Sequence, residues 1–174
     1  DISDFSNQDL LVNSVDFKLQ NIVKDQLISD VPIGAFLSGG VDSSLIVSMM
    51  QSVSDKKINT FSIGFEEEEY NETDQAEAVA NFLGTHHESL IVTPDDLVEA
   101  AKTISKIYDE PFADYSQIPT YLVSKFAKEK VSVVLTGDGG DELFAGYNRH
   151  IAFNRYKYIF QIPLLIRSIL SRLL

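Results

Sequence analysis

Two glycine-rich segments place carboxylates and hydroxyls directly after apolar runs. The first segment is SGGVDSS at residues 38–44, which follows the apolar run at residues 33–37. The second is TGDGGD at residues 136–141, which follows the apolar run at residues 131–135. Polar groups at the carboxyl ends of buried strands are the ones that bind charged ligands in α/β proteins. The sequence therefore indicates a ligand site built from two loops.

The first loop has the composition of an anion-binding loop. Gly39 and Gly40 allow left-handed backbone conformations and close approach to a ligand. The hydroxyls of Ser38 and Ser43 add donors, and the helix that follows would direct its positive end at the ligand. Asp42 would repel a bare phosphate, which favours Mg²⁺ shared between its carboxylate and phosphate oxygens. The alternative is a tight turn between strand and helix in which Asp42 and Ser43 only cap the helix.

Two familiar nucleotide-binding patterns are excluded. The Walker pattern requires a Gly-Lys pair, and the chain contains none. The dinucleotide pattern G-x-G-x-x-G also fails at residues 39–44. A phosphate ligand at this loop would therefore need another binding mode.

The elements that must position the two loops alternate along the chain. Apolar residues at helical spacing predict helices over 7–28, 43–53, 71–84, 94–104, 116–130 and 162–174. Short apolar or β-branched runs predict strands over 33–37, 57–65, 86–92 and 131–135. Alternation of this kind predicts an α/β fold, a doubly wound parallel sheet with helices on both faces. Both loops are then candidates to face the same crevice, where strand order reverses.

The composition limits the class of protein. The 174 residues suffice for one well-buried α/β domain. The net charge of −12 argues against nucleic-acid and anionic-membrane partners, which require excess Lys and Arg. The chain has no cysteine, which excludes disulfides, thiolate metal sites and a cysteine nucleophile. No signal peptide or apolar run of membrane-spanning length occurs, and we expect a cytoplasmic protein.

Four ordered blocks carry a family resemblance. The segment LSGGVDSS resembles the S-G-G-x-D-S signature of the PP-loop ATP pyrophosphatases, which share the adenine nucleotide alpha hydrolase-like fold. That signature alone leaves GMP, NAD and argininosuccinate synthetases and tRNA-modifying enzymes open. Three neighbouring segments narrow the choice among these families: FSIGFEEEEYNETDQAEAVANFLGTHH, YDEPFADYSQIPTYLVS and LTGDGGDELFAGYNR. Over roughly residues 10–155, the chain resembles the synthetase domain of glutamine-dependent asparagine synthetases.

The resemblance implies an ATP-dependent ligase. In the family, ATP adenylates the side-chain carboxylate of aspartate, and ammonia then displaces AMP to give asparagine. An N-terminal glutaminase domain, whose terminal cysteine releases ammonia from glutamine, supplies the ammonia through a tunnel. Because this chain has no cysteine, we expect no working glutaminase within it. The implied cofactors are ATP and Mg²⁺, and the implied partners are the glutaminase domain, small-molecule substrates and a second copy in a homodimer.

The resemblance also implies roles for individual residues. Asp42 and Asp141 would bind the metal, and Asp138 and Asp141 would lie at the reacting centre, where Asp138 assists the attack of ammonia. The expected nucleotide-binding residues are Leu37, Ser38, Gly39, Gly40, Asp42, Ser43, Ile63, Thr136 and Gly137. Among these, Leu37 and Ile63 would contact the adenine through their backbone, and Thr136 and Gly137 would contact AMP. The serines and glycines of the first loop would hold the pyrophosphate.

The chain departs from the family pattern at two site positions. Well-studied asparagine synthetases have serine and glutamate where Thr136 and Asp138 stand. Bacterial relatives in surface-polysaccharide gene clusters share the GDGGDELF version, so the amidated acid can differ from aspartate. The family's lysine that contacts phosphate lies downstream of residue 174. We therefore expect weak or no turnover by this chain alone.

Further expectations concern domain boundaries and local side chains. We expect a synthetase domain over residues 1–155 and the start of a truncated helical portion over residues 156–174. Tyr147 and Arg149 either line the substrate pocket or pair locally. His86 and His87 are adjacent in a predicted strand, point to opposite faces and should not bind one metal ion. The competing functions are a PP-loop ligase that adenylates a nucleotide or tRNA, and a nucleotide-binding module without catalytic activity.

Overall fold

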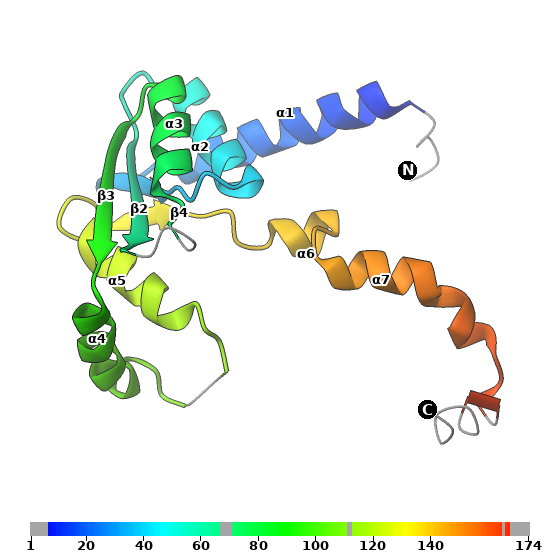
Figure 1. Ribbon diagram of the computed structural model, residues 1–174. Coiled ribbons are helices and arrows are strands. Elements are labelled where there is room, and N and C mark those ends of the chain that lie inside the picture. Colours follow the sequence, from blue (N-terminus) through cyan, green and yellow to red (C-terminus); the bar gives the residue numbers. More distant parts are fainter. Residues whose placement is uncertain (1–6, 67–70, 111–112, 165, 168–174) are drawn as a thin grey trace. The chain divides into compact units, whose positions relative to one another are not determined.

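The computed structural model describes residues 7–66, 71–110, 113–164 and 166–167 (Figure 1). By their contacts, the residues divide into two compact units, 1–137 and 138–174. The first unit contains a parallel sheet of four strands in the order β3-β2-β1-β4. The strands are β1 (Ile33–Phe36), β2 (Asn59–Phe65), β3 (His86–Val92) and β4 (Val133–Leu135). The chain runs outward from β1 to β3 and then returns to the other side of β1, so strand order reverses between β1 and β4.

Among the described residues of the first unit, one helix precedes β1 and four more connect the strands. They are α1 (Gln8–Gln26), α2 (Val41–Val53), α3 (Thr73–Leu83), α4 (Pro94–Ile107) and α5 (Gln117–Ala127). Local signals set most of their ends: Asn7 caps α1, Thr93 and Asp96 form a capping box on α4, and Gly84 ends α3 with φ of 72°. The helix α2 begins at Val41 rather than at residue 43, because Gly40 takes the N-cap position.

The helices cover both faces of the sheet, as the alternating pattern predicts (Figure 1). On one face, side chains of α1, α2 and α3 pack on β1, with Ala35, Val47 and Met50 fully buried. On the other face, Phe61 of β2 packs against Val123 of α5 and meets the Phe126 ring edge-on. Burial on both faces explains why β1 reads as a continuous apolar run instead of an alternating one.

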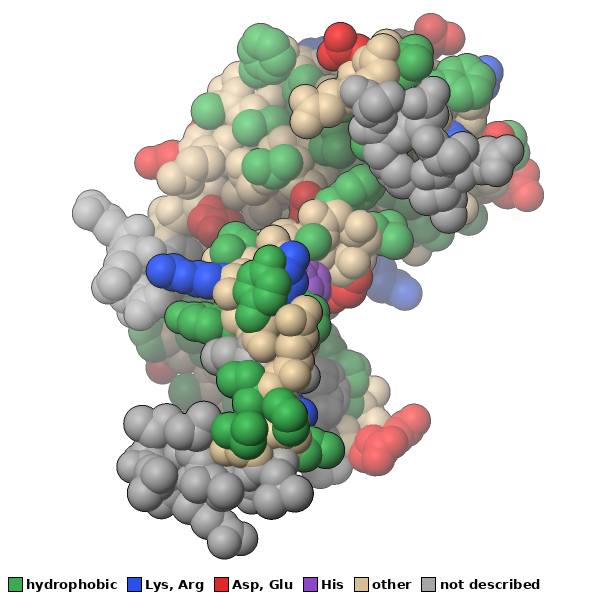
Figure 2. Space-filling view, turned by 90° about the vertical axis from the view of Figure 1, so that its right-hand side faces the viewer, with side chains coloured by type: hydrophobic (Ala, Val, Ile, Leu, Met, Phe, Trp, Pro, Cys, Tyr) green, Lys and Arg blue, Asp and Glu red, His purple; other side chains and the backbone are tan. Residues whose placement is uncertain are grey.

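The second unit is helical. It comprises α6 (Gly140–Phe144), α7 (Asn148–Tyr156) and a 3₁₀ helix over Lys157–Gln161. The sequence pattern does not predict α6 or α7, because neither helix buries an apolar stripe among the described residues. Leu143, Ile151 and Phe153 of this unit are exposed. Figure 2 shows hydrophobic side chains, in green, on the face of the molecule that it presents. Most of the predicted helix over residues 162–174 lies outside the described residues.

None of the helices in the described ranges has the length and hydropathy needed to cross a membrane. The predicted domain boundary at residue 155 stays a prediction. It concerns the extent of the synthetase domain, whereas the division after residue 137 reflects contacts within the chain.

A polar cluster lies on one face of β2 and β3. The ring of His87 shares hydrogen bonds with Thr60 Oγ1 (2.9 Å) through Nδ1, and with Ser62 Oγ (3.3 Å) and Ser89 Oγ (3.1 Å) through Nε2. His86 is exposed and lies 3.4 Å from the Glu88 carboxylate. Both histidine side chains thus have separate protein partners, and among the described residues no group of three His, Asp or Glu forms a metal site.

We expect His87 to make the stability of the fold depend on pH. Burial lowers the pKa of His87 below the ordinary value of 6.5, and the carboxylates of Glu77 and Glu88 oppose this shift only in part. The unfolded chain therefore takes up a proton at this position more readily than the folded chain. The free energy of unfolding should fall as the pH drops through 6.5 towards the lower folded pKa.

Urea unfolding of His87→Gln and wild type from about pH 8 to about pH 5 tests this expectation. The substitution should flatten the pH dependence, and His86→Gln, at the exposed neighbouring position, should retain the dependence due to His87. Parallel curves for wild type and His87→Gln would contradict the prediction. Because His86 also contributes to the lowered pKa of Glu88, the slope of each curve is compared with that of wild type, and only the loss specific to His87→Gln is assigned to His87.

Candidate nucleotide site

The loop after β1 ends in a helix terminus without a side-chain cap. Gly40 is the N-cap residue of α2, and it has no side chain that could accept a hydrogen bond from the first turn. The first N–H groups of a helix have no partner within the helix, so this end of α2 presents donors and a positive dipole. By contrast, Asn7 and Thr93 side chains satisfy the corresponding groups of α1 and α4. The α2 terminus is suited to an anion.

Two serines hold the loop in shape. Ser43 Oγ accepts from Ser38 N (3.2 Å), lies 3.0 Å from Ser38 Oγ and donates to Gly40 O (3.3 Å). Ser38 Oγ accepts in turn from Gly40 N (3.2 Å). The hydroxyls that the sequence assigns to a ligand therefore bind their own loop in this structure. Their mutual hydrogen bonds keep them on the same side of the loop.

Gly39 lets the loop pass close to α3. Its φ is 80°, in the left-handed region, and a Cβ there would lie 2.6 Å from Gln75 Cβ and 2.9 Å from Ala76 N. Any larger residue would be strained and would also collide with the first turn of α3. The sequence indicates the need for glycine but not this contact with α3, which brings together segments far apart in the chain.

The two predicted loops meet at the start of α2. Residues Ile33, Gly34 and Ala35 of β1 align with Val133, Val134 and Leu135 of β4, so both strands end at the same edge of the sheet. A Cβ on Gly137 would lie 2.8 Å from Ser43 N and 2.9 Å from Asp42 Cβ. Thr136 and Gly137 thus lie beside the first loop, at the point of strand reversal where open α/β sheets bind ligands.

Asp42 is the acidic group of this arrangement. It lies in the first turn of α2 and is half-buried. Its carboxylate has no hydrogen-bond or ion-pair partner among the residues that the structure describes. The neighbouring Ser44 Oγ is buried without a partner in the same described set. A metal ion here would need phosphate oxygens or water to complete its ligands, which is the usual arrangement for Mg²⁺.

Leu37 and Ile63 belong to the sheet beside the loop. Leu37 follows β1, is 1% exposed and donates its N–H to Phe61 O (2.9 Å). A contact from Leu37 to a nucleotide would therefore use its carbonyl. Ile63 lies in β2 and packs towards the face that α5 covers. Their predicted roles concern the backbone and stay predictions.

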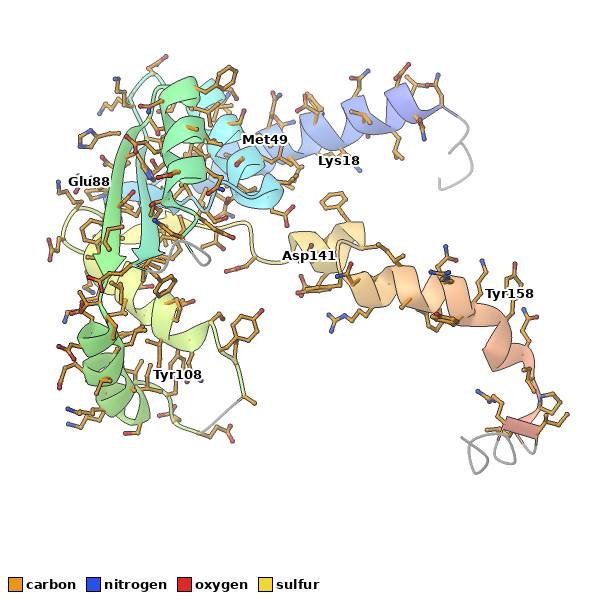
Figure 3. The ribbon with its side chains drawn as sticks, viewed as in Figure 1. Lys18, Met49, Glu88, Tyr108, Asp141 and Tyr158 are labelled. Atoms are coloured by element: carbon orange, nitrogen blue, oxygen red, sulfur yellow. The ribbon has the colours of Figure 1, made fainter. Side chains whose placement is uncertain are left out.

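Asp138 and Asp141 belong to the second unit. Asp138 is exposed, and Asp141 (labelled in Figure 3) is half-buried in α6. A Cβ on Gly146 would collide with Asp141 Oδ1, so the carboxylate occupies the space that this glycine leaves open. The roles of both carboxylates at the reacting centre stay predictions.

Tyr147 and Arg149 pair locally in this unit. The Tyr147 hydroxyl donates to Glu142 Oε1 (2.6 Å), and the Arg149 guanidinium lies 4.1 Å from the centre of the Tyr147 ring. The hydrogen bond lowers the pKa of the Glu142 carboxyl and raises the pKa of the Tyr147 hydroxyl. The sequence does not predict a role for Glu142 or Gly146. For Gly146, no spacing rule links a glycine to a carboxylate five residues earlier.

A cavity of about 260 Å³ lies elsewhere in the first unit. It is lined by residues of α5 and of the segment leading into β4, among them Lys128, Val131 and Val134. None of the predicted site residues lines it.

Comparison with solved structures identifies the fold. An NH₃-dependent NAD synthetase from Campylobacter jejuni aligns with a TM-score of 0.53 and 17% identity over 78% of this chain and 60% of its own. An NMN synthetase from Francisella tularensis gives a TM-score of 0.55 and 18% identity over 78% and 58% of the two chains. The parallel sheet with helices is thus the fold of the PP-loop synthetases, as the resemblance implies.

Sequence comparison gives a narrower relationship. A putative glutamine-hydrolysing asparagine synthetase of Methanocaldococcus jannaschii is 46% identical over 89% of this chain, which spans 30% of that relative. Asparagine synthetase 1 of Bacillus subtilis is 41% identical over 82% of the chain, which spans 22% of it, and asparagine synthetase B of Escherichia coli is 32% identical over 74%. The chain therefore spans less than a third of these relatives' lengths. The asparagine synthase profile matches residues 14–174, and the chain belongs to the asparagine synthase family.

Proposed function

We propose that the protein is a ligase that uses ATP to convert a carboxylate into an amide through an acyl-adenylate. The acid is aspartate, the product is asparagine, and the nitrogen comes from glutamine as ammonia. The observation that carries the proposal is the uncapped N-terminus of α2, with Asp42 in its first turn and Gly137 packed against it. Membership of the asparagine synthase family supports the proposal that the anion bound at this loop is the pyrophosphate part of ATP.

The first step requires an oxygen of the acid to attack the α-phosphorus of ATP, with pyrophosphate as the leaving group. Negative charge then develops on the leaving oxygens. The N–H groups at the start of α2 would stabilise that charge, because preformed donors need no reorganisation during reaction. The Ser38 and Ser43 hydroxyls would add to this by exchanging hydrogen bonds within the loop for hydrogen bonds to phosphate. Mg²⁺ held by Asp42 and phosphate oxygens would neutralise further charge. Thr136 and Gly137 would fix the AMP portion and hold the reactants in line.

The second step requires ammonia to attack the acyl carbon, with AMP as the leaving group. The nitrogen must lose a proton, and Asp138 is the carboxylate proposed to accept it. Asp141 is proposed to bind pyrophosphate and metal. Both residues belong to the segment GDGGDEL, which follows Thr136 directly in the chain.

The source of ammonia is proposed from the relatives. The curated relatives are named glutamine-hydrolysing and are more than three times as long as the segment they share with this chain. A glutaminase domain, as a partner of this chain or as part of the same polypeptide, would supply ammonia. The present chain supplies the residues proposed for adenylation.

A pyrophosphate-release screen tests the proposal. The protein, over the full length that its gene encodes, is incubated with ATP, Mg²⁺, ammonia and one carboxylic acid at a time. We expect release that requires aspartate and yields asparagine and AMP in equal amounts. Release with another acid would reassign the substrate, and ATP binding without release for any acid would indicate a nucleotide-binding module without catalytic activity.

A further inference from the structure

We infer that Gly146 is a positioning residue for Asp141, because its missing side chain leaves the space that the Asp141 carboxylate occupies. The inference rests on the proposed function, in which Asp141 acts on pyrophosphate and metal. Gly146 contributes no functional group of its own, and it acts by orienting the carboxylate of Asp141.

The turn after α6 closes on Asp141. The helix ends at Phe144, and Ala145 takes a left-handed conformation with φ of 59°. The N–H groups of Ala145 and Gly146 both donate to the Asp141 carbonyl, the second at 3.1 Å. These two hydrogen bonds therefore fix the backbone of the turn to Asp141, whose carboxylate lies over Gly146.

A methyl group at position 146 would first contact the end of the Asp141 side chain, which can rotate. A Cβ there would collide with Asp141 Oδ1 and lie 2.9 Å from Asp141 Cγ, but 3.4 Å from Asp141 Cα. The atoms in the way are thus the end of a side chain that can rotate. Gly146 itself is not among the glycines with positive φ, so alanine is compatible with its backbone. Gly146→Ala should turn the Asp141 carboxylate and leave the backbone in place.

A second contact holds the same turn independently. The Tyr147 hydroxyl donates to Glu142 Oε1 (2.6 Å), which links the residue after Gly146 to the residue after Asp141. The Arg149 guanidinium lies over the Tyr147 ring at 4.1 Å. These contacts do not involve the Asp141 carboxylate, so they should persist in Gly146→Ala and keep the turn closed.

The experiment compares Gly146→Ala, Asp141→Asn and the double variant in the full-length protein. We expect Gly146→Ala to lower pyrophosphate release by on the order of 10- to 100-fold, because small displacements of a reacting group cost about this much. Its melting temperature should stay equal or rise slightly, since alanine at a compatible position restricts the unfolded chain. The double variant should be no slower than Asp141→Asn, because both changes remove the same contribution.

Ala145→Gly is the matched control. It changes the adjacent position, relieves the left-handed strain and keeps the N–H that donates to Asp141. Its rate should equal that of wild type. A normal rate for Gly146→Ala, or a double variant that is slower by the product of the two single effects, would overturn the inference.

A measurement without turnover separates this inference from the proposed function. The protein is labelled with carbon isotope at the aspartate carboxyls, and the Asp141 resonance is assigned by its loss in Asp141→Asn. Gly146→Ala should shift that resonance, whereas Ala145→Gly should shift it less. If wild type releases no pyrophosphate with any acid, the proposed function fails, and the resonance alone decides on Gly146. An unshifted resonance would overturn the positioning role.

Discussion

Asp42→Asn is expected to lower pyrophosphate release by on the order of 100-fold or more, while the protein remains folded. The carboxylate lies in the first turn of α2, beside the N–H groups proposed to bind phosphate, and has no partner among the described residues. Asparagine retains the shape but loses the charge that would hold Mg²⁺ against the phosphates. Loss of one electrostatic contribution to a transition state commonly costs this much. Steady-state pyrophosphate release and thermal unfolding measure the two effects.

The alternative interpretation, a turn in which Asp42 only stabilises the helix, makes a different prediction. In that case Asp42→Asn would lose the favourable interaction with the helix dipole, about 0.5 kcal/mol, and leave catalysis unchanged. Asp9→Asn is the matched control, because Asp9 also lies in the first turn of a helix, α1. Asp9→Asn should leave the rate at the wild-type value. A wild-type rate for Asp42→Asn would show that the metal assignment is wrong.

Gly137→Ala is expected to weaken ATP binding by on the order of 10- to 100-fold. The new methyl group would lie 2.8 Å from Ser43 N and 3.0 Å from the Asp42 carbonyl carbon. These are backbone atoms at the start of α2, so the two loops must separate. Overpacking of this kind costs about 1–3 kcal/mol of stability. Isothermal titration with ATP and Mg²⁺, together with urea unfolding, measures both effects.

Gly84→Ala is the control that separates an effect on ATP binding from an effect on stability. Gly84 has φ of 72°, and apart from its chain neighbours no atom of the described residues lies within 4 Å of the position that a methyl group would take there, so Gly84→Ala adds backbone strain without a collision. We expect Gly84→Ala to cost about 1–2 kcal/mol and to bind ATP normally. Equal binding by Gly137→Ala and wild type would mean that contact between the loops does not shape the nucleotide site.

The strands follow from features that the sequence encodes locally. β3 begins and ends where the apolar and β-branched run predicts, at His86 and Val92, and Gly84 stops α3 at the expected residue. The reversal of strand order is not encoded in any single motif. The rule that parallel strands joined by helices place their carboxyl ends at one edge does predict that two loops widely separated in sequence lie at the same edge.

The remaining features depend on contacts that a linear pattern does not contain. The start of α2 at Val41 depends on Gly40 as the N-cap residue, and the closeness of Gly39 to α3 depends on tertiary packing. The helix α7 escapes prediction because its residues bury no apolar stripe in the described chain. The role of Gly146 cannot be predicted from the sequence, because glycine is common in turns. Only the structure shows that the Asp141 carboxylate lies over this glycine.

The central claim is that the acid attacks the α-phosphorus of ATP. Its most direct test uses aspartate whose side-chain carboxylate carries a heavy oxygen isotope, with ammonia as the nitrogen donor and the full-length protein. If an acyl-adenylate forms, one carboxylate oxygen remains on phosphorus when ammonia displaces AMP. We predict that mass spectrometry finds one heavy oxygen in AMP and none in pyrophosphate. Heavy oxygen in inorganic phosphate, with ADP as the other product, would contradict the account.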